Sequence, residues 1–203
     1  MFALIDDQQI TKFFSGNKGV TIGDVQYPKS IFTLWSEAER NAIGIYEVTI
    51  DTTNKKDEAY YINTNVSYGV ESNKAVGSYG PATPKLLEDR NEIDDAGEPL
   101  LDDNGDQIVT KGLKSQQKDI IKKQAAGELQ NTDWYVVRKA DAGTAVPSAI
   151  TTHRAAVRTK ADEMETSITN AADTPALETL YTYTKQEDGS VTRPLGELPT
   201  LDS

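Results

Sequence analysis

The feature that most constrains the fold is an acidic stretch in the middle of the chain, because such a stretch cannot join a hydrophobic core. Between Glu88 and Asp106 the sequence has nine acidic residues and one basic residue, Arg90, which gives −8 of the net charge of −11. A charge run of this density stays solvated. With Pro81 and Pro84 before it, the stretch predicts an acidic, turn-rich connector over residues 83–112 that separates two small domains.

The connector contains an eight-residue repeat. The segment 93–98, Ile-Asp-Asp-Ala-Gly-Glu, recurs as Leu-Asp-Asp-Asn-Gly-Asp over 101–106, and both copies carry turn-forming residues. We expect an irregular hairpin or a solvated linker. Asp102, Asn104 and Asp106 have the alternate spacing with which a calcium loop begins, although the glycine falls one place early and no Glu follows at the closing position. Calcium binding is kept as an alternative.

Residues 1–82 predict a small α+β domain with an antiparallel sheet and one short helix. Two apolar stretches between Phe2 and Phe14 flank a polar turn and indicate a β-hairpin. Ser36 and Glu39 form a capping-box pattern for a helix that ends near Gly44. Further strands are expected at Ile45 to Ile50, Tyr60 to Tyr68 and Ala75 to Tyr79. Most of the tyrosines lie in this part, where we expect half-buried strand residues, with a carbohydrate or protein contact face as the alternative.

Residues 113–182 predict a helical domain built around a helical hairpin. The first helix spans Leu113 to Leu129 and the second runs from Ser148 to about Ala171, with a strand-like piece from Trp134 to Val137 between them. The first has a narrow apolar stripe and four lysines, which either the connector or an acidic partner outside the chain can neutralise. The second has a seam with Arg154 among its members, and its apolar members are Ile150, Val157, Ala161, Met164, Ile168 and Ala171.

The C-terminal residues predict a short helix and an extended arm. Thr174-Pro175 is a start signal for a helix over Ala176 to Tyr181. The arm covers residues 183–203 and contains Asp188-Gly189, a hairpin turn. Because the connector and the arm offer little apolar area, we expect both to be mobile in an isolated chain and to be held by neighbouring chains in a homo-oligomer or a symmetric tail assembly.

The candidate functional residues lie between Leu129 and Arg158. Asp133 can cap or close the helix that ends near Leu129, and Trp134 supplies a large rigid anchor. Arg154 and Arg158 are one helical turn apart, so their guanidinium groups can grip a carboxylate or a ridge of carbonyl groups. In the alternative interpretation, Trp134 fills a small core and both arginines are solvated.

The order of these residues resembles the tail assembly chaperones and tail-fibre assembly proteins of tailed bacteriophages, including those of marine phages. The shared pattern is a helix ending in Leu, then Asp133-Trp134, a polar loop, His153-Arg154 and Arg158. The chain has His153 where the family usually has Tyr, and Leu198-Pro199 where it often has Trp-Pro. The N-terminal segments Met1 to Ile5, Tyr27-Pro28 and Gly44 to Val48 also resemble such proteins. The resemblance implies a protein that assists the folding and trimerisation of fibres, with Asp133, Trp134, His153, Arg154 and Arg158 as partner-binding residues.

Other classes of function have little support in the sequence. The chain has no Cys and one His, and His153 has no neighbouring partner for a catalytic triad or metal site. Nucleic acid and anionic membranes are disfavoured as partners by the negative charge. We therefore expect a non-enzymatic protein without a cofactor, which acts in the host cytoplasm during assembly or on the virion tail. The rivals are a purely structural or receptor-binding component of the virion and a calcium-dependent enzyme or lectin.

Overall fold

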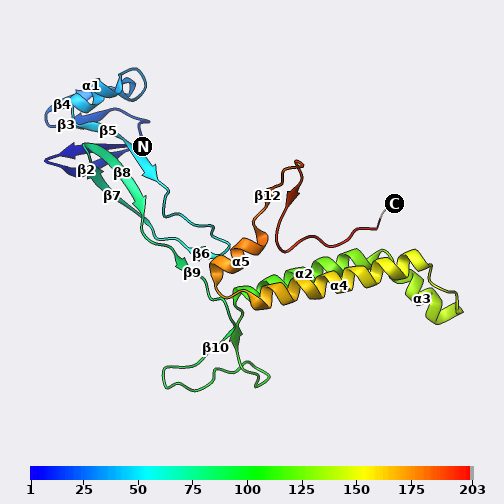
Figure 1. Ribbon diagram of the computed structural model, residues 1–203. Coiled ribbons are helices and arrows are strands. Elements are labelled where there is room, and N and C mark those ends of the chain that lie inside the picture. Colours follow the sequence, from blue (N-terminus) through cyan, green and yellow to red (C-terminus); the bar gives the residue numbers. More distant parts are fainter. Residues whose placement is uncertain (202–203) are drawn as a thin grey trace. The chain divides into compact units, whose positions relative to one another are not determined.

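The structure is a computed structural model that describes residues 1–201. The chain divides between Thr83 and Pro84 into two compact units, an N-terminal sheet unit and a C-terminal unit that contains the long helices (Figure 1). The predicted mixed α+β class is confirmed. Residues 202 and 203 of the expected arm lie outside the described residues.

The N-terminal unit is built around a curled five-stranded sheet with the strand order β2-β1-β5-β8-β7. Its elements are β1 (Phe2–Asp6), β2 (Gln9–Phe14), β3 (Val20–Ile22), β4 (Val25–Tyr27), η1 (Lys29–Phe32), α1 (Glu37–Ala42), β5 (Ile45–Asp51), β6 (Tyr61–Ile62), β7 (Val66–Glu71), β8 (Lys74–Tyr79) and β9 (Thr83–Pro84). The expectation of a fully antiparallel sheet is wrong at one pair, because β5 and β8 run parallel. The expected strand from Tyr60 to Tyr68 is also divided into β6 and the start of β7.

Two tight hairpins bring the ends of this sheet together. Asp7 and Gln8 join β1 to β2 with positive φ angles of 47° and 62°, as a two-residue turn between right-twisted strands requires. Ser72 and Asn73 join β7 to β8 in the same way. The Gln8 side chain donates to Asn73 Oδ1 across 3.0 Å, so the two turns contact each other. The sheet therefore curls until its edge strands meet.

The core of the N-terminal unit lies between the curled sheet and the segment that contains α1. The expected capping box is present, since the Ser36 hydroxyl accepts from the Glu39 amide and the Glu39 carboxylate accepts from the Ser36 amide. Gly44 follows the helix with a φ of 80°. The buried cluster consists of Phe14, Val20, Ile31, Phe32 and Ile45.

The C-terminal unit is built around the predicted helical hairpin, in which α2 and α4 pack side by side (Figure 1). Its elements are β10 (Arg90–Asn91), β11 (Val109–Thr110), α2 (Leu113–Gln130), α3 (Asp133–Ala142), α4 (Ser148–Asn170), α5 (Thr174–Tyr181), β12 (Thr184–Lys185) and β13 (Val191–Thr192). All the predicted seam residues of α4 are buried, Arg154 included. On α2 Ile121 and Ala125 are buried, whereas Ile120 is exposed.

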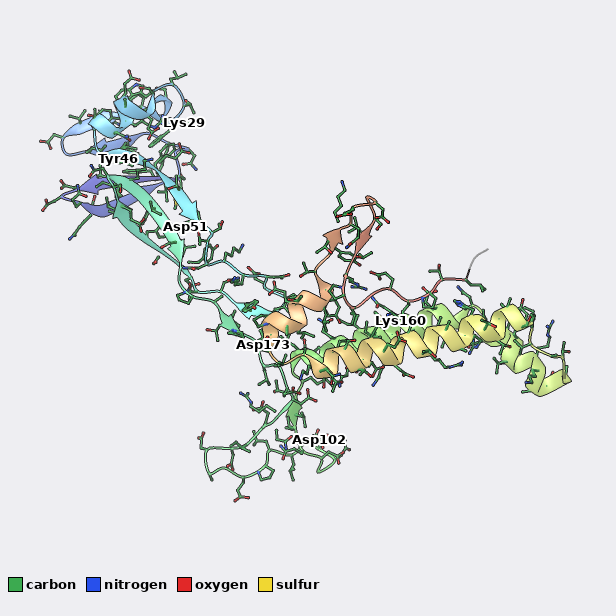
Figure 2. All side chains as sticks on the ribbon, in the orientation of Figure 1. Lys29, Tyr46, Asp51, Asp102, Lys160 and Asp173 are labelled. Carbon is green, nitrogen blue, oxygen red and sulfur yellow. The ribbon has the colours of Figure 1, made fainter. Side chains whose placement is uncertain are left out.

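Two sequence-based expectations about helix boundaries are wrong. Trp134 to Val137 belong to the helix α3 and not to a strand. The residue that caps α5 is Asp173, labelled in Figure 2, and not Thr174. The Asp173 carboxylate accepts from the Ala176 amide across 2.8 Å, which places the proline within the first turn of the helix.

The acidic repeat forms two similar turns, which we call the twin-turn segment (residues 92–108). Asp94 and Asp102, the latter labelled in Figure 2, each accept two backbone N–H groups, and Gly97 and Gly105 take φ angles of 87° and 86°. Three amides eight residues apart bond in a ring: Leu100 donates to Glu92, Ile108 to Leu100, and Glu92 to Ile108. The Gln107 side-chain amide donates to all three of these carbonyl groups across 2.7–3.0 Å.

The connector and the arm both contact the rest of the C-terminal unit, and the expectation that neighbouring chains also hold them stays a prediction. Asp89 anchors the connector to α2, because its carboxylate accepts from the Gly112 amide and the Ser115 hydroxyl across 2.8 and 2.9 Å. The arm is anchored by Leu195, which is 1% exposed and whose amide donates to the Leu180 carbonyl group. Beyond Leu195 the arm and α4 line an open hollow of about 740 Å³.

Candidate partner-binding site

The five sequence-predicted site residues gather where α2, α3 and α4 meet. Only Asn131 and Thr132 separate α2 from α3, and we call residues 129–133 the α2–α3 joint. α3 begins there with Asp133 in its first turn, where a carboxylate is favoured by the helix dipole. It ends at Gly143, whose φ of 69° allows its amide to donate back to the Lys139 carbonyl group.

Arg154 holds the joint together from the facing helix α4. One guanidinium nitrogen donates to the Leu129 carbonyl oxygen across 2.8 Å and to the Thr132 hydroxyl across 2.7 Å. The other lies 2.8 Å from Asp133 Oδ1. The Leu129 carbonyl group lies in the last turn of α2 and also accepts from the Thr132 amide and hydroxyl, so Arg154 adds to this C-terminal cap from another helix. The predicted grip on carbonyl groups and a carboxylate is thus made inside the chain.

The other two predicted residues of α4 differ in exposure. His153 is buried in the seam, and its Nε2 atom lacks a hydrogen-bond partner among the described residues. Arg158 is exposed, and one of its guanidinium nitrogens lies 3.4 Å from the Arg154 carbonyl oxygen. Of the predicted arginine pair, only Arg158 therefore presents its charge to solvent.

Trp134 lies on the outer side of α3 and does not fill a core. No residue of this ten-residue helix is buried; Trp134 is 51% exposed and Val137 65% exposed. Arg138 stacks over the Trp134 ring at 4.7 Å, and the Tyr135 ring lies 3.8 Å from that of Trp134. Trp134, Val137 and Arg138 are spaced by three and four residues, so they share one side of the helix. We call them the Trp134 face.

The opposite side of α3 borders a second feature, an open hollow of about 310 Å³ between α3 and α4. We call it the α3–α4 hollow, and its lining combines aliphatic side chains with three cations. The residues are Val136, Lys139, Ala145, Val146, Thr151, Arg154 and Arg158. Arg154 is paired with Asp133, whereas within residues 1–201 neither Lys139 nor Arg158 forms an ion pair. The hollow is thus locally basic in a chain with a net charge of −11.

The calcium candidates Asp102, Asn104 and Asp106 lie in the second turn of the twin-turn segment. Backbone N–H groups of Asp106 and Asn104 lower the pKa of the Asp102 carboxyl group, whose Oδ1 atom closes its own turn. In the part of the chain that the structure describes, no group of three or more His, Cys, Asp or Glu side chains is arranged to hold a metal ion. The chemistry available at the α3–α4 end of the helices is that of non-covalent binding.

Sequence reasoning missed Val136, Val137, Arg138 and Lys139 as candidate site residues. The run from Trp134 to Val137 is aromatic and β-branched, which favours a strand by propensity. Two signals for a helix were nevertheless present, namely Gly143 as a C-terminal cap and the spacing of Trp134, Val137 and Arg138.

Within residues 1–201, no helix has the length and apolar character needed to cross a membrane. Comparison with protein-family models, with curated proteins and with solved structures gave no significant match.

Proposed function

We propose that the chain is a non-enzymatic accessory protein of bacteriophage tails, which binds a tail or tail-fibre protein and assists its assembly in the host cytoplasm. The contact is made through the Trp134 face. The order of residues between Leu129 and Arg158 supports the proposal through its resemblance to tail assembly chaperones.

The observation that carries the proposal is the exposure of the Trp134 face on a helix with no buried residue. A helix of this length is marginal in water without tertiary packing, and a partner would supply that packing. Trp and Arg are also the residues that most often dominate protein interfaces. In the free chain, stacking between Arg138 and Trp134 holds the two side chains in place for such a contact.

Trp134→Ala tests the proposal in a pull-down with the tail-fibre protein of the same phage. We expect binding to weaken by about 2–4 kcal/mol, the range of an interface hot spot. The melting temperature should stay unchanged, because the side chain is half-exposed in the free chain. Leu34→Ala is the matched control, since Leu34 is the most exposed large apolar residue of the described chain and lies in the other unit. Unchanged binding by Trp134→Ala would contradict the proposal.

The alternative is a structural or receptor-binding component of the virion. The location of the chain, in lysates or in purified virions, distinguishes it from a chaperone. A chaperone is expected in lysates and not in purified virions. Two observations together would favour the alternative. The chain would be present at a fixed stoichiometric copy number in virions, and fibres would assemble normally without it.

A further inference from the structure

We propose that the α3–α4 hollow binds the twin-turn segment of a second copy of this chain, so that copies associate head to tail. This inference does not rest on the proposed function. It uses the side of α3 that carries Val136 and Lys139, opposite the Trp134 face. The two contacts can therefore be tested by different substitutions.

The hollow offers a basic and aliphatic surface whose charges are not matched within the chain. Lys139 and Arg158 line it and are exposed, and neither forms an ion pair within residues 1–201. One guanidinium nitrogen of Arg158 lies 3.4 Å from the Arg154 carbonyl oxygen. Val136 and Val146 supply apolar area beside the two cations. The fitting ligand is a segment that places a carboxylate next to an aliphatic side chain.

The twin-turn segment has this chemistry twice. In the first turn Ile93 is 58% exposed, and in the second Leu101 is 56% exposed. Asp94 and Asp102 use their carboxylates to close the turns. The next residues, Asp95 and Asp103, are exposed and have no ion-pair partner among residues 1–201. Each turn therefore presents an exposed aliphatic side chain and, two residues further on, a carboxylate that forms no ion pair within residues 1–201.

The backbone of the twin-turn segment is already ordered, which favours its role as a ligand. The ring of hydrogen bonds among Glu92, Leu100 and Ile108, with the Gln107 amide bonded to all three carbonyl groups, fixes the two turns. A preordered ligand loses less conformational entropy when it binds. The net charge of −8 between Glu88 and Asp106 also attracts it to a basic hollow.

A second copy, and not the same chain, is the occupant because the two surfaces belong to opposite ends of α2. The connector is fixed to the first turn of α2 by Asp89 and by the Leu113 amide, which donates to the Leu86 carbonyl group. The hollow lies beyond the other end of α2, whose 18 residues span about 27 Å. Each chain thus carries one donor and one acceptor surface, which is the arrangement of a heterologous contact that forms rings or filaments.

Analytical ultracentrifugation of the full chain at low ionic strength provides the test. We expect concentration-dependent association that weakens when salt is raised from about 50 mM to about 500 mM. The double variant Lys139→Glu with Arg158→Glu should weaken association at least about tenfold. The control Lys18→Glu with Lys56→Glu changes the net charge equally but lies in the N-terminal unit, and it should associate as the unchanged chain does.

A mixing experiment makes the head-to-tail geometry testable. The turn variant Asp95→Asn with Asp103→Asn keeps an intact hollow, and the Lys139→Glu, Arg158→Glu variant keeps intact turns. Each alone should be monomeric, whereas their mixture should form a 1:1 dimer that grows no further, because only one productive contact remains. Circular dichroism checks that all variants fold.

Three results would overturn the inference. They are a chain that stays monomeric at low salt, association that the hollow variant leaves unchanged, and a mixture that fails to form the 1:1 dimer. If the hollow variant instead loses binding to the fibre protein while the unchanged chain is monomeric, the hollow belongs to the fibre and not to a second copy. Trp134→Ala should leave self-association intact, so failure of the proposed function and failure of this inference are distinguishable.

Discussion

Arg154 of α4 donates to the carbonyl oxygen of Leu129 across 2.8 Å, so one helix of the hairpin caps the end of the other. The same guanidinium holds Asp133 at the start of α3. One side chain of α4 thus contacts the end of α2, the joint and the start of α3. The position of the Trp134 face and of the α3–α4 hollow depends on that side chain, although it does not reach solvent as a ligand-binding group.

Arg154→Leu is expected to destabilise the C-terminal unit by about 2–4 kcal/mol, because it removes the buried guanidinium group that donates to the Leu129 carbonyl group and the Thr132 hydroxyl and pairs with Asp133. Urea unfolding measures the loss, and hydrogen exchange should show faster opening of amides 129–135. Arg158→Leu is the control on the same helix. Its side chain is exposed, so we expect a change within about 0.5 kcal/mol. Equal effects of the two substitutions would contradict the capping role.

Substitution of the two turn glycines should loosen the twin-turn segment. Gly97 and Gly105 have φ angles near 87°, where an L-residue is strained by about 1–2 kcal/mol. Gly97→Ala and Gly105→Ala should each reduce the hydrogen-exchange protection of the Leu100 and Ile108 amides. In Gly127→Ala the same change falls within helix α2, where open space surrounds the added methyl group. Gly127→Ala should stabilise the chain by about 0.5–1 kcal/mol. If it destabilises the chain instead, the effects of Gly97→Ala and Gly105→Ala cannot be assigned to their positive φ angles.

The parts of the fold that could be predicted are those that local signals determine. The capping box at Ser36 and the seam of α4 each follow from a spacing of three or four residues. The parallel pairing of β5 with β8 could not be predicted, because strand periodicity contains no information on which strand lies beside which. The β-propensity of Trp134 to Val137 favoured a strand, whereas the helical spacing of Trp134, Val137 and Arg138 and the cap at Gly143 agree with the helix that forms.

The sequence indicated which residues make up the candidate site, but not the hydrogen bonds and the ion pair that they form with one another. The pair Arg154 and Arg158 was expected to bind one target together. Packing of α4 on α2 buries Arg154 next to the carbonyl groups that end α2, and leaves Arg158 outside. The seam spacing placed Arg154 on the side of α4 that faces α2, but the groups that it binds there depend on where α2 ends and α3 begins, which the spacing does not determine.

The anchor between the connector and α2 should depend on pH. Hydrogen bonds from the Gly112 amide and the Ser115 hydroxyl hold the pKa of Asp89 below its ordinary value of 3.8. A lowered pKa in the folded state stabilises the fold above the ordinary value, and this contribution is lost as the pH falls through the folded-state pKa. Asp89→Ala should therefore lower the melting temperature at neutral pH. The difference from the unchanged chain should be constant above about pH 4 and should shrink as the pH falls through the acid range below about pH 4. A constant difference across this range would assign the effect to something other than the carboxylate.

Leu195 attaches the C-terminal arm to the rest of the C-terminal unit. This side chain is 1% exposed, and Arg193 and Glu197 beside it form an ion pair of 2.8 Å. Because the ion pair is mostly exposed on its acidic side, the apolar contact supplies most of the attachment. Leu195→Ala should cost about 2–4 kcal/mol of local stability. In a monomeric sample, the arm's hydrogen-bonded amides, such as those of Leu195 and Gly196, should then lose their protection from hydrogen exchange while α2 and α4 stay protected. Val191→Ala, at an exposed position of the same arm, should leave the protection unchanged. If these amides exchange freely in the unchanged monomer, the arm is not held by its own chain and a neighbouring copy must order it.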